Sequence, residues 1–195
     1  MPRGRPRQFD AHKALDRALK VFWRKGYEGA SLSDLTRAMR INRPSLYAAF
    51  GDKQALFRKA LDRYMQGPAD YIRQAMEAPT AREAVERLLA GATDLLGDPR
   101  HPRGCLIVQG ALACGKEAEC VRKDLGLRRV ACQDVIRQRL EQALAEGDLP
   151  AGADPAALAR YLAALIHGMA VLAASGAGRE ELREVAETAL RSWPQ

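Results

Sequence analysis

The chain has 195 residues, of which 47% are hydrophobic and 28% charged, and its formal net charge is +7. This length allows one large domain or two small ones with a real core, and this charged fraction excludes a body embedded in a membrane. No apolar segment follows the N-terminal sequence MPRGRPRQF, so we expect no secretory signal and a soluble, cytoplasmic protein.

The positive charge is confined to the first third of the chain. Residues 1–65 carry 15 Lys and Arg against 6 Asp and Glu, whereas residues 66–195 carry 16 against 18. A basic segment joined to a nearly neutral one is typical of a polyanion-binding module attached to a second unit. A solvated basic face without a partner is the alternative.

The first expected helix follows Asp10, which stands at an N-cap position, and Gly26 is expected as its C-terminal stop. Its apolar residues recur at helical spacing from Ala11 to Phe22. Ser31 and Asp34 have the spacing of a capping box, which predicts a second, short helix ending near residue 39.

A third helix is expected directly afterwards, since Asn42 can cap it and Pro44 lies in its first turn. Asp52 is expected to cap a longer helix over residues 53–77. No segment alternates like a strand, so the predicted fold class is all-α. The remaining expected helices cover residues 80–96, 103–114, 117–146, 154–175 and 179–192.

Two short helices joined by a tight turn, at residues 32–39 and 43–49, have the geometry of a helix-turn-helix. The second would expose Arg43, Ser45 and Ala49 and bury Leu46 and Phe50. Arg43 and Ser45 at its N-terminus are suited to base edges and phosphates in a major groove. Tyr47 and Lys53 stand where they could hold the DNA backbone. An αα-hairpin with a solvated basic face is the structural alternative.

The segment GYEGASLSDLTRAMRINRPSLYAAFGDKQALF resembles the N-terminal domain of TetR/AcrR-type transcriptional regulators. The resemblance covers residues 10–60 and includes the Leu46-Tyr47-x-x-Phe50-x-x-Lys53 pattern. It implies a homodimeric regulator, usually a repressor, that a small ligand releases from a pseudo-palindromic operator in double-stranded DNA. Carried over residue by residue, the resemblance implies that six side chains lie at or near DNA: Ser31, Arg43, Pro44, Ser45, Tyr47 and Lys53.

Two positions depart from the pattern of that family. Arg40 stands in the turn where the family often has Gly, so a positive φ there would be strained. Ala49 replaces a frequent His and removes one expected phosphate contact.

The N-terminal arm, residues 1–9, contains Arg3-Gly4-Arg5-Pro6, which resembles the core of an AT-hook. Arg3 and Arg5 would then lie in a narrow minor groove. A disordered tail that adds solubility is the alternative.

Cys105 begins the segment RGCLIVQGALAC and would lie in the first turn of a helix, close to Arg103. Both features favour a reactive thiolate. Some TetR-type regulators with a similar segment respond to oxidants or electrophiles, so the resemblance allows a sensor role. A small buried core residue is the alternative. Cys114 and Cys120 flank a helix break, where a disulfide is conceivable, and Cys132 is interpreted as core. No metal site or cofactor is expected, because no Cys-x-x-Cys or His cluster occurs.

The resemblance places an effector pocket among the helices between residues 53 and 175. Gln109 is a polar candidate, because a buried amide needs partners that a ligand could supply. His167, within the 14-residue apolar run YLAALIHGMAVLAA, is a pocket candidate or a packed interface residue. That run is too short to span a bilayer and is interpreted as buried. The candidate effector residues are Cys105, Gln109, Met76, Tyr71, His167 and Met169; further wall candidates are Tyr64, Met65, Leu106, Ile136 and Leu165.

The last two expected helices cover residues 154–175 and 179–192, and the stretch ALARYLAALIHGMAVLAASG in the first of them has small residues on several faces. This pattern favours a two-fold dimer with a four-helix interface. We therefore expect three parts: an arm over residues 1–9, a helix-turn-helix domain over 10–52, and a ligand-binding and dimerisation domain over 53–195. An enzyme is disfavoured because no catalytic motif occurs. An architectural DNA-binding protein without an effector is the remaining rival.

Overall fold

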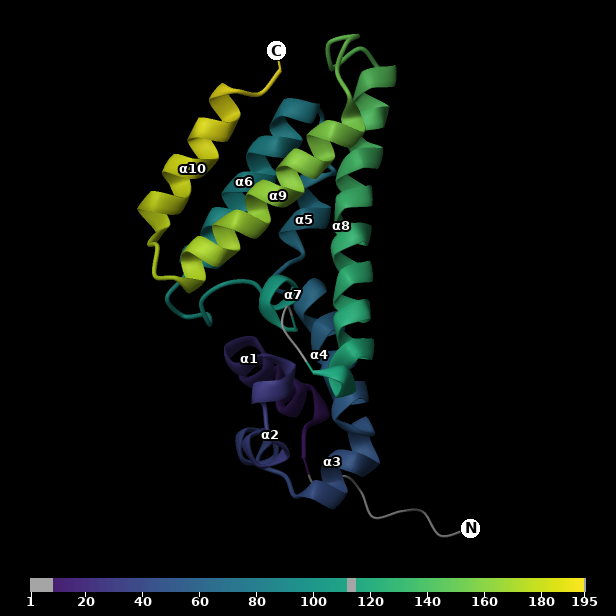
Figure 1. The fold of residues 1–195 in the computed structure, drawn as a ribbon, viewed down its shortest axis with the longest axis vertical. Coiled ribbons are helices and arrows are strands. Elements are labelled where there is room, and N and C mark those ends of the chain that lie inside the picture. The colour runs from purple at the N-terminus through teal and green to yellow at the C-terminus, as the bar shows by residue number, and fades with distance from the viewer. Residues whose placement is uncertain (1–8, 112–114, 195) are drawn as a thin grey trace.

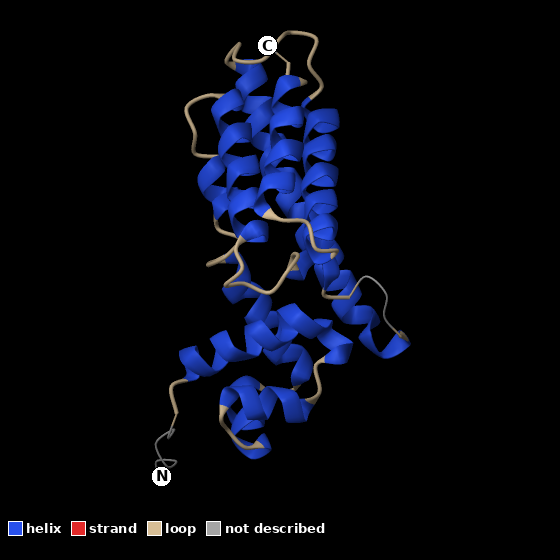
Figure 2. Ribbon diagram, turned by 90° about the vertical axis from the view of Figure 1, so that its left-hand side faces the viewer, coloured by secondary structure: helices blue, strands red, loops and turns tan. Residues whose placement is uncertain are grey.

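The computed structural model describes residues 9–111 and 115–194, and within these ranges it contains helices and no strands. The predicted all-α class is therefore confirmed. The first three helices form the lower end of the molecule in Figure 1, α4 rises from it, and helices α5, α6, α8, α9 and α10 form a bundle above (Figures 1 and 2).

The N-terminal helices begin at the predicted caps. Helix α1 (Ala11–Gly29) begins where the Asp10 carboxylate accepts hydrogen bonds from the backbone N–H groups of His12 and Lys13. Gly26 interrupts α1 with φ 67°, which fits its predicted role as a stop, and one further turn follows it. Helices α2 (Leu32–Met39) and α3 (Arg43–Phe50) complete this end of the molecule.

The prediction of a single long helix over residues 53–77 is wrong. Helix α4 (Lys53–Met65) ends before a turn that contains Gly67 and Pro68, and α5 (Tyr71–Ala75) follows it. Proline lacks the N–H that a continuing helix needs and disfavours the helical conformation of the preceding residue. This break turns α5 toward α6 (Ala81–Gly97), against which it packs.

The helix expected over residues 103–114 is also much shorter. Helix α7 (Leu106–Gln109) has a single turn, with Cys105 at its N-cap in an extended conformation. Cys114 lies outside the described residues, and so does the disulfide considered for it. A short 3₁₀ helix, η1 (Lys116–Ala118), leads into the long α8 (Glu119–Ala145).

Helices α9 (Pro155–Ala174) and α10 (Arg179–Arg191) end the chain. The 14-residue apolar run lies within α9. The whole helix has 20 residues and, by length and composition only, is long and apolar enough to cross a membrane. The expectation that this helix is buried is wrong, since only 28% of its most apolar window is buried. A large part of this apolar helix is therefore left uncovered by its own chain.

Two hydrophobic clusters fill the molecule. One cluster contains residues from α1, α2, α3 and α4, together with residues from α7 and the start of α8. The other, which we call the upper cluster, contains residues from α5, α6, α8, α9 and α10. Tyr71 and Cys105 are partly buried and pack against both clusters. Cys105 thus lies where the N-terminal helices meet the upper bundle.

Candidate DNA-binding surface and effector cavity

The helix-turn-helix has the cap geometry that the sequence predicts. Ser31 Oγ accepts a hydrogen bond from the Asp34 N–H at 3.0 Å and donates one to its carboxylate at 2.8 Å. Asn42 Oδ1 accepts from the Ser45 N–H at 2.8 Å and starts α3. Arg40, in the turn between the helices, has φ 58° and ψ 44°. The expected positive φ at a residue other than Gly is therefore present, and it closes the turn.

Helix α3 presents one face to solvent and packs the other. Leu46 and Phe50 are buried, while Arg43 and Pro44 are exposed and Tyr47 is 47% exposed. Ser45 is half-buried, so its hydroxyl is less open than expected. Ala48 is exposed and Ala49 is half-buried against the core. The prediction that Ala49 is exposed is wrong, and Ala48 is the exposed residue instead, because α3 packs through Leu46, Ala49 and Phe50 at helical spacing.

The remaining candidate DNA-binding side chains already have neighbours. Arg43 Nη2 donates to Ser33 Oγ at 3.4 Å. The Lys53 ammonium lies 4.5 Å from the centre of the Tyr27 ring, and burial lowers the pKa of Lys53. This cation–π contact fixes the charge at the start of α4, beside α3. Arg3 and Arg5 lie outside the described residues.

Two exposed cations beside α3 were not predicted. Arg37 is in the last turn of α2 and Arg40 is in the turn. The sequence could have indicated both residues, because it places them at the turn directly before α3. Lys25 is engaged elsewhere: it pairs with Asp34 at 2.8 Å and is the main reason that the pKa of Asp34 is lowered to about 2.

A small apolar cavity lies between α4, α5, α7, α8 and α9. It has a volume of about 40 Å³, and an open apolar groove of about 440 Å³ between α4–α5 and α8 adjoins it. Cys132, Ala69 and Ile72 line both, so they separate the enclosed space from the open one. The cavity walls include Tyr64, Tyr71, Ile72, Cys105, Ile107, Val108, Arg129, Cys132, Gln133, Ile136, Ile166 and His167.

Cys105 contacts Tyr64 within this cavity. The Tyr64 hydroxyl donates a hydrogen bond to Cys105 Sγ at 3.3 Å, and Tyr64 is fully buried. One expectation about Cys105 is wrong: it occupies the N-cap position of a four-residue helix, without a side-chain capping hydrogen bond, instead of lying in the first turn of a long one. The Arg103 guanidinium lies beside Gly176. The hydroxyl of Tyr64 is the polar group that the structure gives to this sulfur.

Three side chains from α8 and α9 with polar atoms also line this apolar cavity: Arg129, Cys132 and His167. Arg129 Nη1 donates to the Ile107 carbonyl at 2.7 Å. Burial, together with the charge of Arg129, lowers the pKa of His167, so the imidazole is neutral at pH 7. Burial raises the pKa of Cys132 to about 11, which keeps this second thiol protonated.

The cavity brings together Tyr71, Cys105 and His167 from the predicted effector residues. The side chain of Gln109 packs over Gly104, and Met169 is buried in the upper cluster against which Met76 also packs. Among the further wall candidates, Tyr64 and Ile136 line the cavity, whereas Met65 lines the adjoining groove and Leu106 is core. Leu165 packs against the upper cluster.

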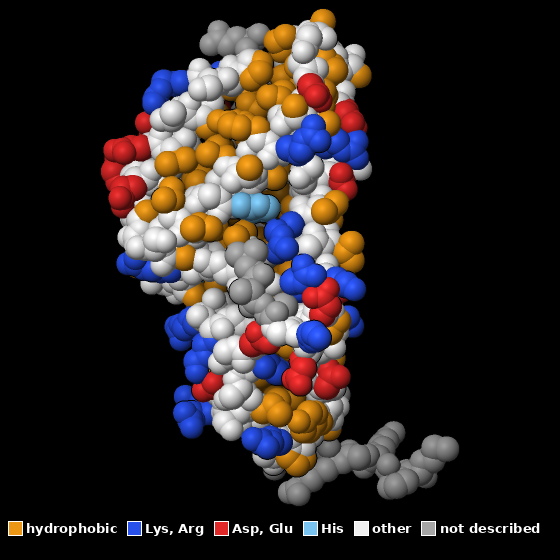
Figure 3. All heavy atoms as spheres, viewed as in Figure 1, with side chains coloured by type: hydrophobic (Ala, Val, Ile, Leu, Met, Phe, Trp, Pro, Cys, Tyr) orange, Lys and Arg blue, Asp and Glu red, His pale blue; other side chains and the backbone are white. Residues whose placement is uncertain are grey.

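The uncovered side of α9 is mostly apolar, with Arg160 as an exposed charge near its N-terminal end. Its exposed residues recur at helical spacing and include Tyr161, Val171 and Leu172 among the large ones. Small residues lie between them: Ala157, Ala164 and Gly168. Figure 3 shows hydrophobic side chains gathered over the upper part of this face of the molecule. We call this surface the α9 face, defined by Ala157, Tyr161, Ala164, Gly168, Val171 and Leu172.

A capped helix-turn-helix with a basic exposed face, joined to a helical bundle, defines a helix-turn-helix DNA-binding regulator. Residues 14–60 match the family model for "Bacterial regulatory proteins, tetR family", and residues 81–190 match that for "Tetracyclin repressor-like, C-terminal domain". The chain belongs to the TetR family of transcriptional regulators.

Named relatives agree with this assignment. The HTH-type transcriptional repressor ComR of Escherichia coli K12 is 35% identical over 99% of this chain and 93% of its own length. A cysteine mutant of the TetR-family regulator CifR, complexed with 26-base-pair operator DNA, is 46% identical, with a TM-score of 0.94 over 97% of this chain and 100% of that chain. A TetR regulator from Rhodococcus sp. RHA1 is also 46% identical, covers 95% of this chain and 100% of its own, and has a TM-score of 0.64.

Proposed function

We propose that α3 binds the major groove of an operator in double-stranded DNA, with Arg43 and Ser45 at its N-terminus directed toward base edges. Arg43, Pro44 and Tyr47 form its exposed face, and the buried Leu46 and Phe50 fix its orientation. Ser31, Tyr47 and Lys53 hold the phosphate backbone, and Arg3 and Arg5 in the arm bind a narrow minor groove. This exposed, capped start of α3 is the observation that carries the proposal.

The regulator acts as a homodimer that pairs through the α9 face. Exposed apolar side chains at helical spacing, with small residues between them, allow two helices to approach closely. A two-fold pair presents two copies of α3 to the two halves of a pseudo-palindromic operator. The CifR relative, which is complexed with double-stranded operator DNA, supports binding to an operator.

Repression ends when the cavity around Cys105 is occupied, either by a small molecule or by a modification of the thiol. A volume of about 40 Å³ is far below the ~300 Å³ or more of ordinary ligand pockets. A small adduct on Cys105 therefore fits this cavity better than a large ligand bound without a covalent bond. Tyr71 and His167 complete its walls; Gln109, Met76 and Met169 line it only after rearrangement.

The protein works in the cytoplasm and acts by binding, without catalysing a reaction. Its three parts are the arm over residues 1–9, the DNA-binding domain over 10–52, and the effector and dimerisation domain over 53–195. The family-model match at residues 81–190 lies within the third part, whereas the match at residues 14–60 extends past residue 52, so the boundary there rests on the start of α4.

Operator selection from fragmented genomic DNA, followed by fluorescence anisotropy with excess random competitor, tests the DNA-binding proposal. Arg43→Ala is expected to weaken operator binding by about 1–3 kcal/mol and to relax base preference at one position. Arg82→Ala is the matched control, since Arg82 is an exposed cation on α6 paired with Glu86. Equal affinity for any duplex would instead support an architectural DNA-binding protein.

The same assay tests release. Treatment with a thiol-alkylating reagent is expected to weaken operator binding of the native protein and to leave a Cys105→Ser variant unaffected. Specific binding that the reagent does not change would rule out the cysteine mechanism and leave a non-covalent effector.

A further inference from the structure

The segment around α7 is attached to α1 by three hydrogen bonds. The Trp23 indole N–H donates to the Gly104 carbonyl at 2.8 Å, the Tyr27 N–H donates to the Gly110 carbonyl at 2.9 Å, and the Gly115 N–H donates to Glu28 Oε1 at 3.0 Å. Each uses a backbone group of the segment. Gly104 directly precedes Cys105, and Figure 1 shows α7 between α1 and the upper bundle.

Among the three α1 residues in these hydrogen bonds, Trp23 also packs against the rings of Tyr64 and His101. Its side chain is 5% exposed and its ring meets the Tyr64 ring edge-on, with centres 4.8 Å apart. The imidazole of His101 stacks on it at 5.3 Å. Tyr64 is the residue whose hydroxyl donates to Cys105 Sγ. Trp23 therefore contacts both the residue before Cys105 and the side chain that holds its sulfur.

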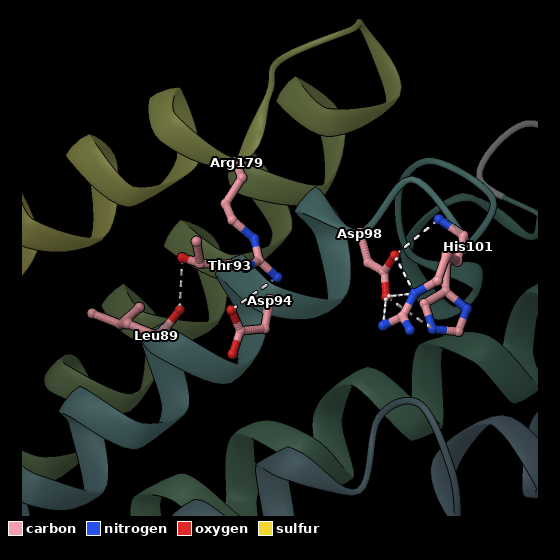
Figure 4. A network of polar contacts seen from close by, with 7 residues as sticks. Leu89, Thr93, Asp94, Asp98, His101 and Arg179 are labelled. Atoms are coloured by element: carbon pink, nitrogen blue, oxygen red, sulfur yellow. Dashed lines mark hydrogen bonds and ion pairs between the residues drawn. The ribbon is translucent and has the colours of Figure 1, made fainter.

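The loop that carries His101 is held at the point where it leaves α6. The Asp98 carboxylate accepts hydrogen bonds from Arg100 and lies 3.8 Å from His101 Nε2, as Figure 4 shows. Nearby, Arg179 pairs with Asp94 and ties the end of α6 to α10. The end of α6 thus anchors the start of the loop that leads to Cys105.

We propose that Trp23 couples the Cys105 cavity to the DNA-binding helices. The inference rests on the proposed effector role of Cys105 and names the residue that transmits it. An adduct on Sγ occupies the space next to the Tyr64 hydroxyl and displaces Gly104. The buried indole N–H then loses its acceptor, an unfavourable state that α1 relieves by moving. Because α1 shares a hydrophobic cluster with α2 and α3, the recognition helix moves with it.

N-ethylmaleimide is the probe, in a protein whose Cys114, Cys120 and Cys132 are replaced by Ala. The Cys105 sulfur forms a bond to one alkene carbon of the maleimide, and the thiol proton ends on the other. The quantity measured is the ratio of operator Kd after alkylation to Kd before it. Coupling between two sites typically changes affinity by about 5- to 150-fold.

Trp23→Phe keeps an aromatic ring but removes the indole donor, and it is expected to reduce this ratio at least about threefold, within the range of one lost hydrogen bond. Trp193→Phe is the matched control: Trp193 is also buried, at 4% exposure, but in the upper cluster. A purely structural role of Trp23 would weaken DNA binding before and after alkylation alike and leave the ratio unchanged, which would overturn the inference.

Fluorescence supplies a second readout that needs no variant of Trp23. The chain has 2 tryptophans, so Trp193→Phe leaves Trp23 as the sole indole. Its emission is expected to shift when Cys105 is alkylated without DNA, and to stay unchanged when Cys105 is replaced by Ser. Alkylated protein with unchanged emission contradicts the inference. If alkylation leaves the operator affinity of the Cys105-only protein intact, the proposed function itself fails; if only the Trp23→Phe ratio is undiminished, the inference alone fails.

Discussion

The Tyr64 hydroxyl and the Cys105 sulfur meet at 3.3 Å in the enclosed cavity between the N-terminal helices and the upper bundle. Burial, with Cys105 nearby, raises the pKa of Tyr64 well above its usual value, so this hydroxyl keeps its proton. It therefore remains a donor throughout the neutral range. A donor directed at a sulfur stabilises negative charge that develops there.

Tyr64→Phe is accordingly expected to slow alkylation of Cys105. Losing one hydrogen bond to a charged acceptor, worth about 1.5–3 kcal/mol, corresponds to roughly a tenfold slower reaction or more. The rate is measured by mass spectrometry of the peptide that contains Cys105. Tyr71→Phe is the matched control, since Tyr71 lines the same cavity. Equal rates in the two variants would show that the Tyr64 hydroxyl does not assist the thiolate.

Arg40→Gly is expected to stabilise the protein. Arg40 has φ 58°, a left-handed conformation that disfavours side chains by about 1–2 kcal/mol, whereas glycine adopts it freely. The flexibility of glycine in the unfolded chain offsets part of this, leaving a gain of about 0.5–1 kcal/mol. Urea denaturation measures it. Arg40→Ala removes the same charge but keeps the strain, so a gain in that variant would contradict the explanation.

Leu172→Glu is expected to break the dimer. Leu172 is 45% exposed on the α9 face, and a carboxylate buried there without a partner costs several kcal/mol. Light scattering should then give the 21.4 kDa mass of one chain in place of twice that value. Leu127→Glu introduces the same charge on α8, at a leucine that is 69% exposed, and should leave the dimer intact. A monomer in both variants would move the interface to include α8.

His167 should make the folded state less stable in mild acid. Its pKa in the folded protein is lowered below the ordinary 6.5, by burial first and by the Arg129 charge second. Above that ordinary value both states are neutral. As the pH falls through it, the unfolded chain binds a proton that the folded one does not, so the free energy of unfolding decreases, by at most about 1.4 kcal/mol per pH unit.

His167→Asn removes this proton and should flatten the decrease between about pH 7 and pH 5. The quantity to compare is the difference in urea midpoint between native protein and variant at the two pH values. A difference that stays constant would mean that His167 titrates alike in the folded and unfolded chains.

The caps were predictable because they are local. Asp10, Ser31, Asn42 and Asp52 each precede the helix that they start, and their side chains bond to N–H groups two or three residues away. Gly67-Pro68 is also a clear sequence signal for a break between two helices, but the helical periodicity on either side of it favours one continuous helix.

The cavity could not be predicted in the same way. It joins Tyr64, Cys105 and His167, which are distant in sequence, and its size depends on how α4, α7, α8 and α9 pack. The burial of Arg139 could not be predicted either, because it depends on contacts with residues that are distant in sequence. This arginine is buried on α8 and donates to the carbonyls of Ala78 and Pro79, although arginine in a helix ordinarily indicates an exposed face.

The break in α1 at Gly26 has a genetic consequence. With φ 67° at Gly26, the Tyr27 amide points away from its own helix and bonds to Gly110. Because the donor is main chain, replacing the Tyr27 side chain leaves that bond available, and alanine scanning will not detect it. The substitutions that reveal it fall on the glycines: a methyl group at Gly26 would lie 3.1 Å from the Gly110 oxygen, and one at Gly110 would lie 2.6 Å from that of Leu106. Variants that lose this main-chain hydrogen bond between α1 and the α7 segment should therefore map to the codons of Gly26 and Gly110.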